Sequence, residues 1–211
     1  MERSDLDFSL SEEQQLVQGA VREFATTRVA PRREALDHAN AHPEDLVSGM
    51  AELGLFGVLA PEDAGGAGLG YVTHATAIEE ISRASGAVGA ILVAQAIVVE
   101  TLARAGGRAA LVAELASGAK LAAPAFIETD DGALTTEADD DGAEARLTGV
   151  KRMAPFPGRA GAYVAVARTP QGGRAMYLID PSATGFVHSA RESTLGLHGF
   201  ETASLVLDKT P

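Results

Sequence analysis

The chain has 211 residues, of which 17 are Lys or Arg and 29 are Asp or Glu, so its formal net charge is −12. That length suits one or two domains, and 46% hydrophobic with 22% charged residues is typical of a globular protein rather than a disordered one. The absence of cysteine excludes disulfides, thiolate metal sites and a cysteine nucleophile. The strong negative charge argues against nucleic acid, because binding there requires a basic face.

The N-terminal stretch MERSDLDFSLSEEQQ is acidic and polar, which is not the pattern of a signal peptide. No apolar run is expected to approach the roughly 18 residues of a membrane span. We therefore expect a cytoplasmic protein that binds neither nucleic acid nor a membrane.

Helical periodicity dominates the first half of the chain. Ser11-Glu12-Glu13-Gln14 is a capping-box pattern, and the apolar residues after it are spaced for one face of a helix that ends near Pro31. A second helix is predicted to open at Pro43 and to stop at Gly54. The segment PEDAGGAGLG at residues 61–70 holds too many glycines for a helix and is predicted to be a loop.

Three further helices are predicted before residue 119. The first follows Gly70 and is broken by the segment from Ser82 to Gly89. The second covers Ala90–Ala105 and is apolar almost all round, which is typical of a helix buried between others. The last is a short helix from Arg108 to Ala116.

From residue 120 the sequence alternates apolar and polar residues between turn clusters, which predicts short strands. The candidate strands are Leu121–Glu128, Leu134–Ala138, Glu144–Leu147, Ala162–Ala167, Ala175–Ile179 and Ala203–Leu207. Many short strands at this spacing indicate a small antiparallel β-sandwich or barrel. The sequence thus predicts an α+β chain, with an N-terminal all-α helical domain at residues 1–119 and a β domain at residues 120–211.

The residue pattern by itself supports no catalytic or metal constellation. The glycines of residues 61–70 fit neither G-x-G-x-x-G nor a P-loop, so a turn is the expected structure. The five histidines lack zinc-ligand spacing, and His38 and His42, in polar sequence, are expected at the surface. The Asp139–Asp141 run with Glu144 is expected to form a solvated hairpin turn rather than a calcium site. No metal site and no catalytic residue is assigned.

Five stretches are recognisable in order along the chain. They are DFSLSEEQQLVQGAVREFATTRVAP, LGLFGVLAPEDAGGAGLGYVTHATAIEEISRASGAVG, ELASGAKLAAPAFIE, RLTGVKRMAPFPGRAGAYVAVART and LGLHGFETASLVLDKTP. In this order and spacing the chain resembles the acyl-CoA dehydrogenase family over nearly its whole length. The resemblance implies an N-terminal helical domain, a middle β domain and a C-terminal four-helix domain, with FAD and a fatty acyl-CoA bound between the last two.

The implied activity is that of an acyl-CoA dehydrogenase-like flavoprotein, which converts an acyl thioester to a trans-enoyl thioester. In the family a carboxylate takes the α-proton while the β-hydride goes to flavin N5. The family counterpart of the helix Ala90–Ala105 lines the acyl pocket. By that match Ala90, Val93, Ala94 and Ile97 would face an acyl chain, and plain core packing is the equally weighted alternative.

Two segments depart from the family's flavin motifs. After the first strand, Ile127-Glu128-Thr129-Asp130-Asp131-Gly132 stands where the family has xTEPxAGSD, so a hydroxyl residue becomes Ile127 and the serine on the CoA side has no equivalent. The K-x-W-I-(T/S)-N segment becomes Lys151–Phe156, with Met153 in place of tryptophan and Pro155 in place of a hydroxyl residue. Each loss is expected to cost about 1–3 kcal/mol of flavin affinity.

The resemblance still places a set of residues on the middle-domain side of FAD: Phe126, Ile127, Met153, Ala154 and Pro155. Backbone N–H groups of Phe126 and Ile127 would bond the flavin ring. Whether FAD is bound at all is left open by the altered motifs.

The chain ends at Pro211, where the family's middle domain ends, so the C-terminal helical domain with the usual base is expected to be missing. Either the polypeptide is a fragment or a separate subunit supplies the rest. The β domain should then expose an unpaired apolar face, which predicts a homo- or hetero-oligomer. Arg152, Arg159 and Lys151 are charged candidates near that face, and Lys151 is expected more simply as a solvated strand-end residue.

Three functions remain open. The first is an acyl-CoA dehydrogenase-type flavoprotein, or part of one. The second is a non-catalytic, family-derived subunit that stabilises or completes a partner, which the altered flavin motifs and the missing base favour. The third is a flavin-dependent monooxygenase of the same fold, which the absent CoA-side serine keeps open.

Overall fold

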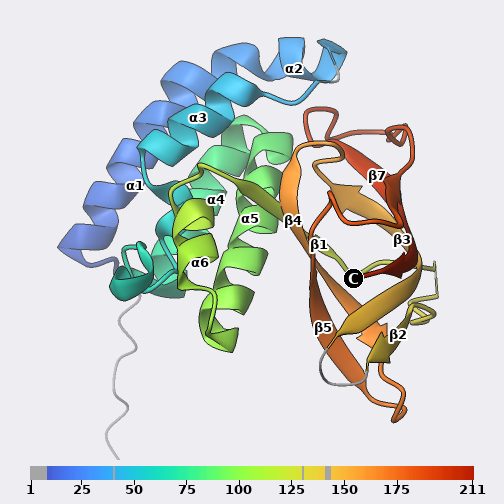
Figure 1. The fold of residues 1–211 in the computed structure, drawn as a ribbon. Helices are drawn as coiled ribbons and strands as arrows, with labels where there is room; N and C mark the ends of the chain where they lie inside the picture. Colours follow the sequence, from blue (N-terminus) through green and yellow to red (C-terminus); the bar gives the residue numbers. More distant parts are fainter. Residues whose placement is uncertain (1–8, 40, 130, 141–143) are drawn as a thin grey trace, which may run out of the picture.

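A computed structural model describes residues 9–39, 41–129, 131–140 and 144–211. A helical body stands beside a β-sheet body, and the chain passes from one to the other at β1 (Figure 1). The helices are α1 Glu12–Phe24, α2 Arg33–Ala39, α3 Glu44–Glu52, α4 Gly70–Ala84, α5 Gly86–Ala105 and α6 Ala109–Ala116. The strands are β1 Leu121–Ala125, β2 Glu137–Asp140, β3 Ala145–Pro155, β4 Ala160–Arg168, β5 Arg174–Ile179, β6 Phe186–His188 and β7 Thr202–Thr210. The predicted succession of a helical half and a strand half is confirmed.

The first helix begins with the predicted capping box. The Ser11 hydroxyl accepts the Gln14 N–H at 3.2 Å, and the Gln14 side chain accepts the Ser11 N–H at 2.9 Å. The predicted helix end near Pro31 is wrong, because the helical path continues through a π turn at Ala25–Val29 and a 3₁₀ turn at Ala30–Arg32 into α2. Proline has no N–H to leave unpaired, so it is tolerated where the hydrogen-bond pattern changes.

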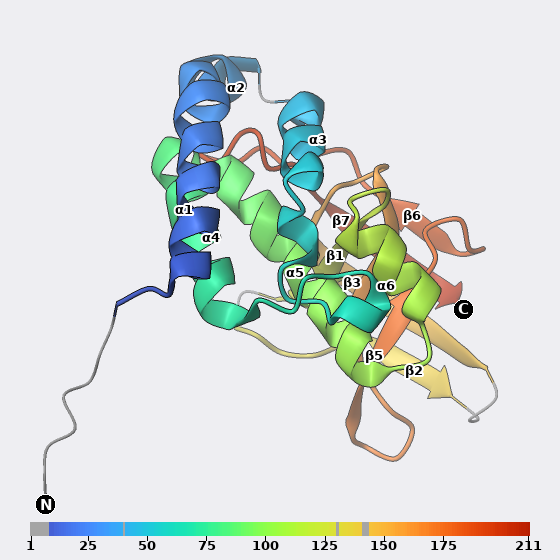
Figure 2. The ribbon, with the colours of Figure 1, turned by 90° about the vertical axis from the view of Figure 1, so that its left-hand side faces the viewer.

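Helix α5 crosses the helical body with α4 and α6 packed on it and the sheet behind it (Figure 2). The predicted break from Ser82 to Gly89 shrinks to Ser85, whose hydroxyl accepts the Val88 N–H at 3.4 Å and caps α5. The expectation of no long apolar run is also wrong, since α5 has 20 residues and by length and composition could cross a membrane. Packing inside the protein, which buries 61% of its most apolar stretch, accounts for this composition.

The strands follow the order β1-β4-β2-β3-β7-β6, and β5 pairs with β4. The expectation of a purely antiparallel domain is wrong in part, because β1 runs parallel to β4, with Ala125 opposite Ala165. Strand β2 also meets β4 in parallel, at Glu137 and Arg168. The pairs β2–β3, β4–β5 and β6–β7 are antiparallel. Strand β1 can lie parallel because two strands separate it from β4 in the chain, and so long a connection sets no antiparallel constraint.

Several predicted strand limits need correction. Strand β1 ends at Ala125, before the predicted Glu128, and β3 continues far beyond Leu147 to Pro155. Asp139 and Asp140 belong to β2 rather than to a hairpin turn, and Asp141 lies outside the described residues. The short elements α2 and β6 were not predicted, because three to seven residues carry too little periodicity to register.

A buried glutamine links the two bodies. Gln95 of α5 is inaccessible to solvent, and its side-chain amide donates to the carbonyl oxygens of Leu115 and Lys120, each at 2.9 Å. Its side-chain oxygen accepts the Ala122 N–H of β1 at 2.8 Å. One side chain therefore fixes the end of α6 and the start of β1 against α5.

Replacing this side chain should destabilise the whole chain. We expect Gln95→Leu to lower the free energy of unfolding by about 2–4 kcal/mol, because buried backbone groups of Leu115, Lys120 and Ala122 lose their partners. Urea denaturation measures the change. The control is Gln15→Leu, which removes an exposed bond to the Leu10 carbonyl and should cost within about 0.5 kcal/mol. Equal losses in both variants would contradict this role for Gln95.

Candidate functional site

An open apolar groove of about 380 Å³ lies between α5 and the sheet. Its lining comes from α5, from β1 and the segment after it, from β3, and from the residues before β7: Ala90, Val93, Ala94, Ile97, Pro124, Phe126, Ile127, Arg152, Met153, Pro155 and Phe200. The structure thus brings together every residue predicted for the acyl side and the flavin side except Ala154, which is fully buried and does not line the groove. Phe200 and Pro124 were not predicted, because nothing in their local sequence marks them.

The groove is open to solvent along apolar side chains. Ile127 is 53% exposed, Met153 45%, and Phe126 and Ile97 38% each. Of the described residues that line it, Arg152 alone carries a charge. The expected apolar face beside Met153 is therefore present, and it is a hollow rather than a flat patch.

A β-bulge explains why two consecutive residues of β3 face outward. The register between β3 and β7 shifts between Lys151 and Ala154, and Met153 adopts the left-handed conformation with φ 52°. The alternation of buried and exposed residues breaks there, so that Arg152 and Met153 are both exposed. The Arg152 N–H donates to the Ile127 carbonyl at 2.7 Å, which joins the bulge to the segment after β1.

The expectation that Lys151 is a solvated strand-end residue is wrong. Its side chain is fully buried and forms an ion pair with Glu128, while its ammonium also donates to the Val166 carbonyl of β4. Glu128 accepts further bonds from the Thr135 hydroxyl at 2.6 Å and the Thr136 N–H at 2.9 Å. Burial raises the pKa of Glu128, but the bonds from Lys151, Thr135 and Thr136 outweigh it and bring that pKa to about 2.

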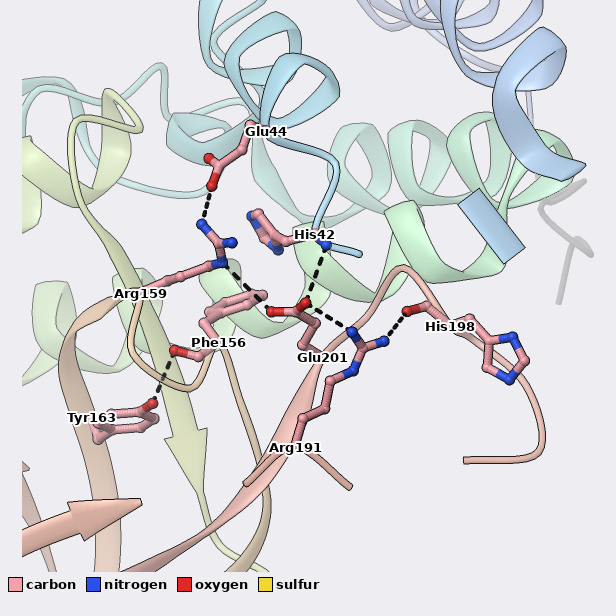
Figure 3. Close-up of polar contacts among 8 residues, drawn as sticks. All are labelled: His42, Glu44, Phe156, Arg159, Tyr163, Arg191, His198 and Glu201. Carbon is pink, nitrogen blue, oxygen red and sulfur yellow. Dashed lines mark hydrogen bonds and ion pairs between the residues drawn. The ribbon is translucent and has the colours of Figure 1, made fainter. Parts of the chain in front are cut away.

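His42, expected at the surface, is buried at the junction of the two bodies (Figure 3). Its ring meets the ring of Phe156 edge-on at 5.8 Å, and Phe156 meets the groove residue Phe200 at 5.9 Å. Among the described residues neither ring nitrogen of His42 has a hydrogen-bond partner. Burial lowers the pKa of His42, and the nearby Arg159 lowers it further. The polar sequence around this residue gave no sign of burial.

Glu201 lies at the same junction and contacts two arginine side chains, those of Arg159 and Arg191 (Figure 3). Its carboxylate accepts a hydrogen bond from the Arg191 guanidinium at 3.0 Å and one from the backbone N–H of His42 at 3.3 Å. It also lies 3.5 Å from Arg159 Nε. Arg159 also pairs with Glu44 of α3. Arg159 therefore ties the sheet to α3 and does not line the groove, whereas the sequence placed it near the open face.

His198 holds the segment before β7 against α2. Its Nδ1 lies 2.9 Å from the Asp37 carbonyl oxygen, and its Nε2 lies 3.0 Å from that of Thr194. Carbonyl oxygens only accept, so the geometry favours an imidazolium that donates from both nitrogens. The bonds to Asp37 and Thr194 accordingly raise the pKa of His198.

This geometry predicts a pH-dependent contribution to stability. Because the folded-state pKa of His198 lies above its ordinary value of 6.5, the stabilisation is complete below pH 6.5 and is lost as pH rises through the raised value. We expect His198→Gln to lose the most stability, relative to wild type, at pH 6 and progressively less toward pH 9, measured by urea denaturation. The exposed His38→Gln is the control. A gap that widens with rising pH would contradict the assignment.

His42 should show the opposite dependence. Its folded-state pKa is lowered, so the unfolded chain binds a proton more readily and stability falls as pH drops below 6.5. We expect the stability advantage of His42→Phe over wild type to grow as pH falls from 7 to 5, since the variant keeps an aromatic ring against Phe156 but has no group to protonate. Thermal denaturation across that range measures it, and a constant difference between the two proteins would refute the prediction.

Comparisons with known proteins agree with this architecture. The family model "Acyl-CoA dehydrogenase, N-terminal domain" matches residues 11–119. An acyl-CoA dehydrogenase of Bacillus subtilis is 33% identical over 211 residues, which span 94% of this chain and 56% of that protein. The chain thus spans about half the length of such curated relatives.

Two solved structures superpose closely. A glutaryl-coenzyme A dehydrogenase in complex with glutaryl-CoA matches with a TM-score of 0.91 at 30% identity, over 97% of this chain and 56% of that one. An acyl-CoA dehydrogenase of Bacillus anthracis complexed with FAD matches with a TM-score of 0.82 at 25% identity, over 96% of this chain and 36% of that one.

Proposed function

This chain belongs to the acyl-CoA dehydrogenase family, and we propose that its groove is one wall of a site for FAD and an acyl thioester. The observation that carries the proposal is the convergence of α5, the segment after β1 and the bulge of β3 on a single open apolar groove. Relatives solved with glutaryl-CoA and with FAD share the fold that builds this groove, which supports the same ligand classes here.

The residues present fit a flavin ring on its apolar faces. Met153, Pro155 and Ile127 offer an apolar surface on the sheet side, and the lining residues include no hydroxyl side chain. The polar edge of the ring would therefore bind main-chain groups, for which the N–H groups of Phe126 and Ile127 are the candidates. When bound, FAD would supply the acceptor for a hydride.

The α5 side of the groove suits an acyl chain. Ala90 and Ala94 are small and sit one helical turn apart, and Val93 and Ile97 flank them, so the helix offers a shallow apolar track. These side chains would exclude water from the α and β carbons of the bound acyl group and orient those carbons toward the sheet wall. The reaction we propose is α,β-dehydrogenation of an acyl-CoA.

The base for that reaction must come from elsewhere than the groove lining, because no Asp or Glu is among the described residues that line it. We propose that a further segment or subunit supplies the base and covers the exposed side chains of Ile127 and Met153. The functional form is then an oligomer or a longer chain.

Flavin binding tests the proposal directly. We expect the purified chain to acquire a flavin absorption band on mixing with FAD, and Met153→Asp to weaken binding at least 10-fold, because its carboxylate would be desolvated against the ring. The matched control is Met176→Asp, since Met176 is 59% exposed on β5 and does not line the groove. That control should bind FAD within twofold of wild type. A wild-type chain that ignores FAD at high micromolar concentration would overturn the proposal.

A second candidate is a non-catalytic subunit that completes a partner's site. The absence of a carboxylate among the described lining residues favours it. This role predicts that the FAD-loaded chain stays inactive with acyl-CoA and an artificial electron acceptor until a separate polypeptide joins it in fixed stoichiometry. Turnover by the chain alone would exclude this candidate, and it would also contradict the proposal that a further segment or subunit supplies the base.

A further inference from the structure

The Lys151–Glu128 ion pair lies directly behind the sheet wall of the groove. Glu128 follows Ile127 in the chain, and Lys151 precedes Arg152 and Met153. Their side chains are 1% and 0% exposed, so neither charge reaches solvent or the groove. The pair therefore would not touch a ligand in the groove. Each of its two residues is, however, next in sequence to a residue that lines the groove.

The pair belongs to a closed network that joins the two wall segments. The Arg152 N–H donates to the Ile127 carbonyl at 2.7 Å, next to the ion pair itself. Behind them, Lys151 donates to the Val166 carbonyl of β4, a strand that pairs with β1, β2 and β5. The other oxygen of Glu128 accepts the Thr136 N–H at 2.9 Å and the Thr135 hydroxyl at 2.6 Å. The segment after β1 and the bulge of β3 are thus held to each other and to β4.

A buried ion pair is weak as a stability device, because the cost of desolvating both charges offsets most of their attraction. What such a pair imposes is geometry. If one member is neutralised, the remaining charge is unpaired in the interior and must approach water. Each charge is carried by a segment that forms the wall, so its movement displaces Ile127 or Met153.

We propose that Lys151 and Glu128 are positioning residues that set the sheet wall of the groove, acting through Ile127 on one side and Arg152–Met153 on the other. This inference rests on the proposed function, because FAD affinity is the measurement that reports on the geometry of the sheet wall. It predicts that the two residues act as a unit on ligand affinity, beyond any effect on stability.

A double-mutant cycle separates positioning from stability. The variants are Glu128→Gln, Lys151→Gln and the double variant, each assayed for FAD affinity, for the resolved shoulders of the bound-flavin absorption band, and for its urea midpoint. We expect each single variant to weaken FAD binding at least 10-fold and to blur the shoulders. The double variant, which leaves no buried charge, should recover to within about threefold of wild type.

A second ion pair provides the matched control. Arg22 and Glu80, 2.7 Å apart, join α1 to α4, with Glu80 4% exposed, and neither lines the groove. The same cycle with Arg22→Gln and Glu80→Gln should change the urea midpoint but leave FAD affinity within twofold of wild type. Single variants at Glu128 or Lys151 that fold and bind FAD like wild type would overturn the proposal, as would strictly additive losses in the double variant.

Two further measurements keep the test decisive. If the single variants do not fold, Glu128→Asp keeps the charge but shortens the side chain by one methylene, and it should weaken FAD binding about three- to 10-fold with a nearly unchanged urea midpoint. If wild type itself binds no FAD, the proposed function fails, and amide hydrogen exchange still tests the positioning. Exchange of the Arg152 amide should then rise at least 10-fold in Glu128→Gln, Lys151→Gln or Glu128→Asp, should return to within about threefold of wild type in the double variant, and should not rise in the Arg22–Glu80 cycle. Unchanged exchange at Arg152 would refute the positioning role.

Discussion

The close approach of α5 to β1 is the constraint on which the rest of the structure depends. Strand β1 is composed almost entirely of alanine and proline, and Ala122, Ala123 and Ala125 are completely buried. Such small side chains allow a helix and a strand to pack with little space between them. Strand β1 also continues the sheet through its parallel pairing with β4, so the helix is held against the sheet by the strand that links the two bodies. The groove opens where β1 ends and this packing stops.

The junction of the two bodies is held by groups with opposite proton requirements. His42 is buried with no partner for its ring among the described residues and is stable there only when neutral. His198 faces two carbonyl oxygens and is best satisfied when charged. Between them, Glu201 accepts from Arg191 and lies beside Arg159, which lowers the cost of burying its carboxylate. Both requirements are met together only between the lowered pKa of His42 and the raised pKa of His198, because His42 disfavours acid and His198 disfavours base.

The sequence was sufficient for whatever depends on local pattern. The capping box at Ser11 and the stop at Gly54 were predictable because a single turn of backbone determines each of them. Most of the groove lining, without Pro124 and Phe200, was predictable through resemblance to a family, since helical periodicity places Ala90, Ala94 and Ile97 near one another but does not say what faces them. The parallel pairing of β1 with β4 was not predictable, because it depends on a contact between residues about 40 positions apart in the chain.

The sequence did not predict which polar residues are buried. Lys151 and His42 were both expected in solvent, as their residue types and polar neighbours indicate, and both lie in the interior. Each is explained by a partner distant in sequence: Glu128 for Lys151, and Phe156 for the ring of His42. No pattern within a few residues of Lys151 indicates that its partner is a carboxylate more than 20 positions earlier in the chain. Such residues break the local rules where the fold needs a fixed geometry.

The groove combines a rigid back with an open front, and this contrast bears on how the site works. Its sheet wall is held from behind by the ion pair of Lys151 with Glu128 and by the main-chain bond from Arg152 to Ile127, neither of which a ligand has to form. Its front consists of the exposed apolar side chains of Ile127 and Met153, whose contact with water is unfavourable until something covers them. Ordering of the wall is therefore complete before binding, so apolar contact with a ligand is not offset by the entropy of arranging the chain. The same wall would suit both proposed functions, a dehydrogenase completed by a further segment and a subunit that completes a partner, because both proposals need this side of the site to be fixed before the other side covers it.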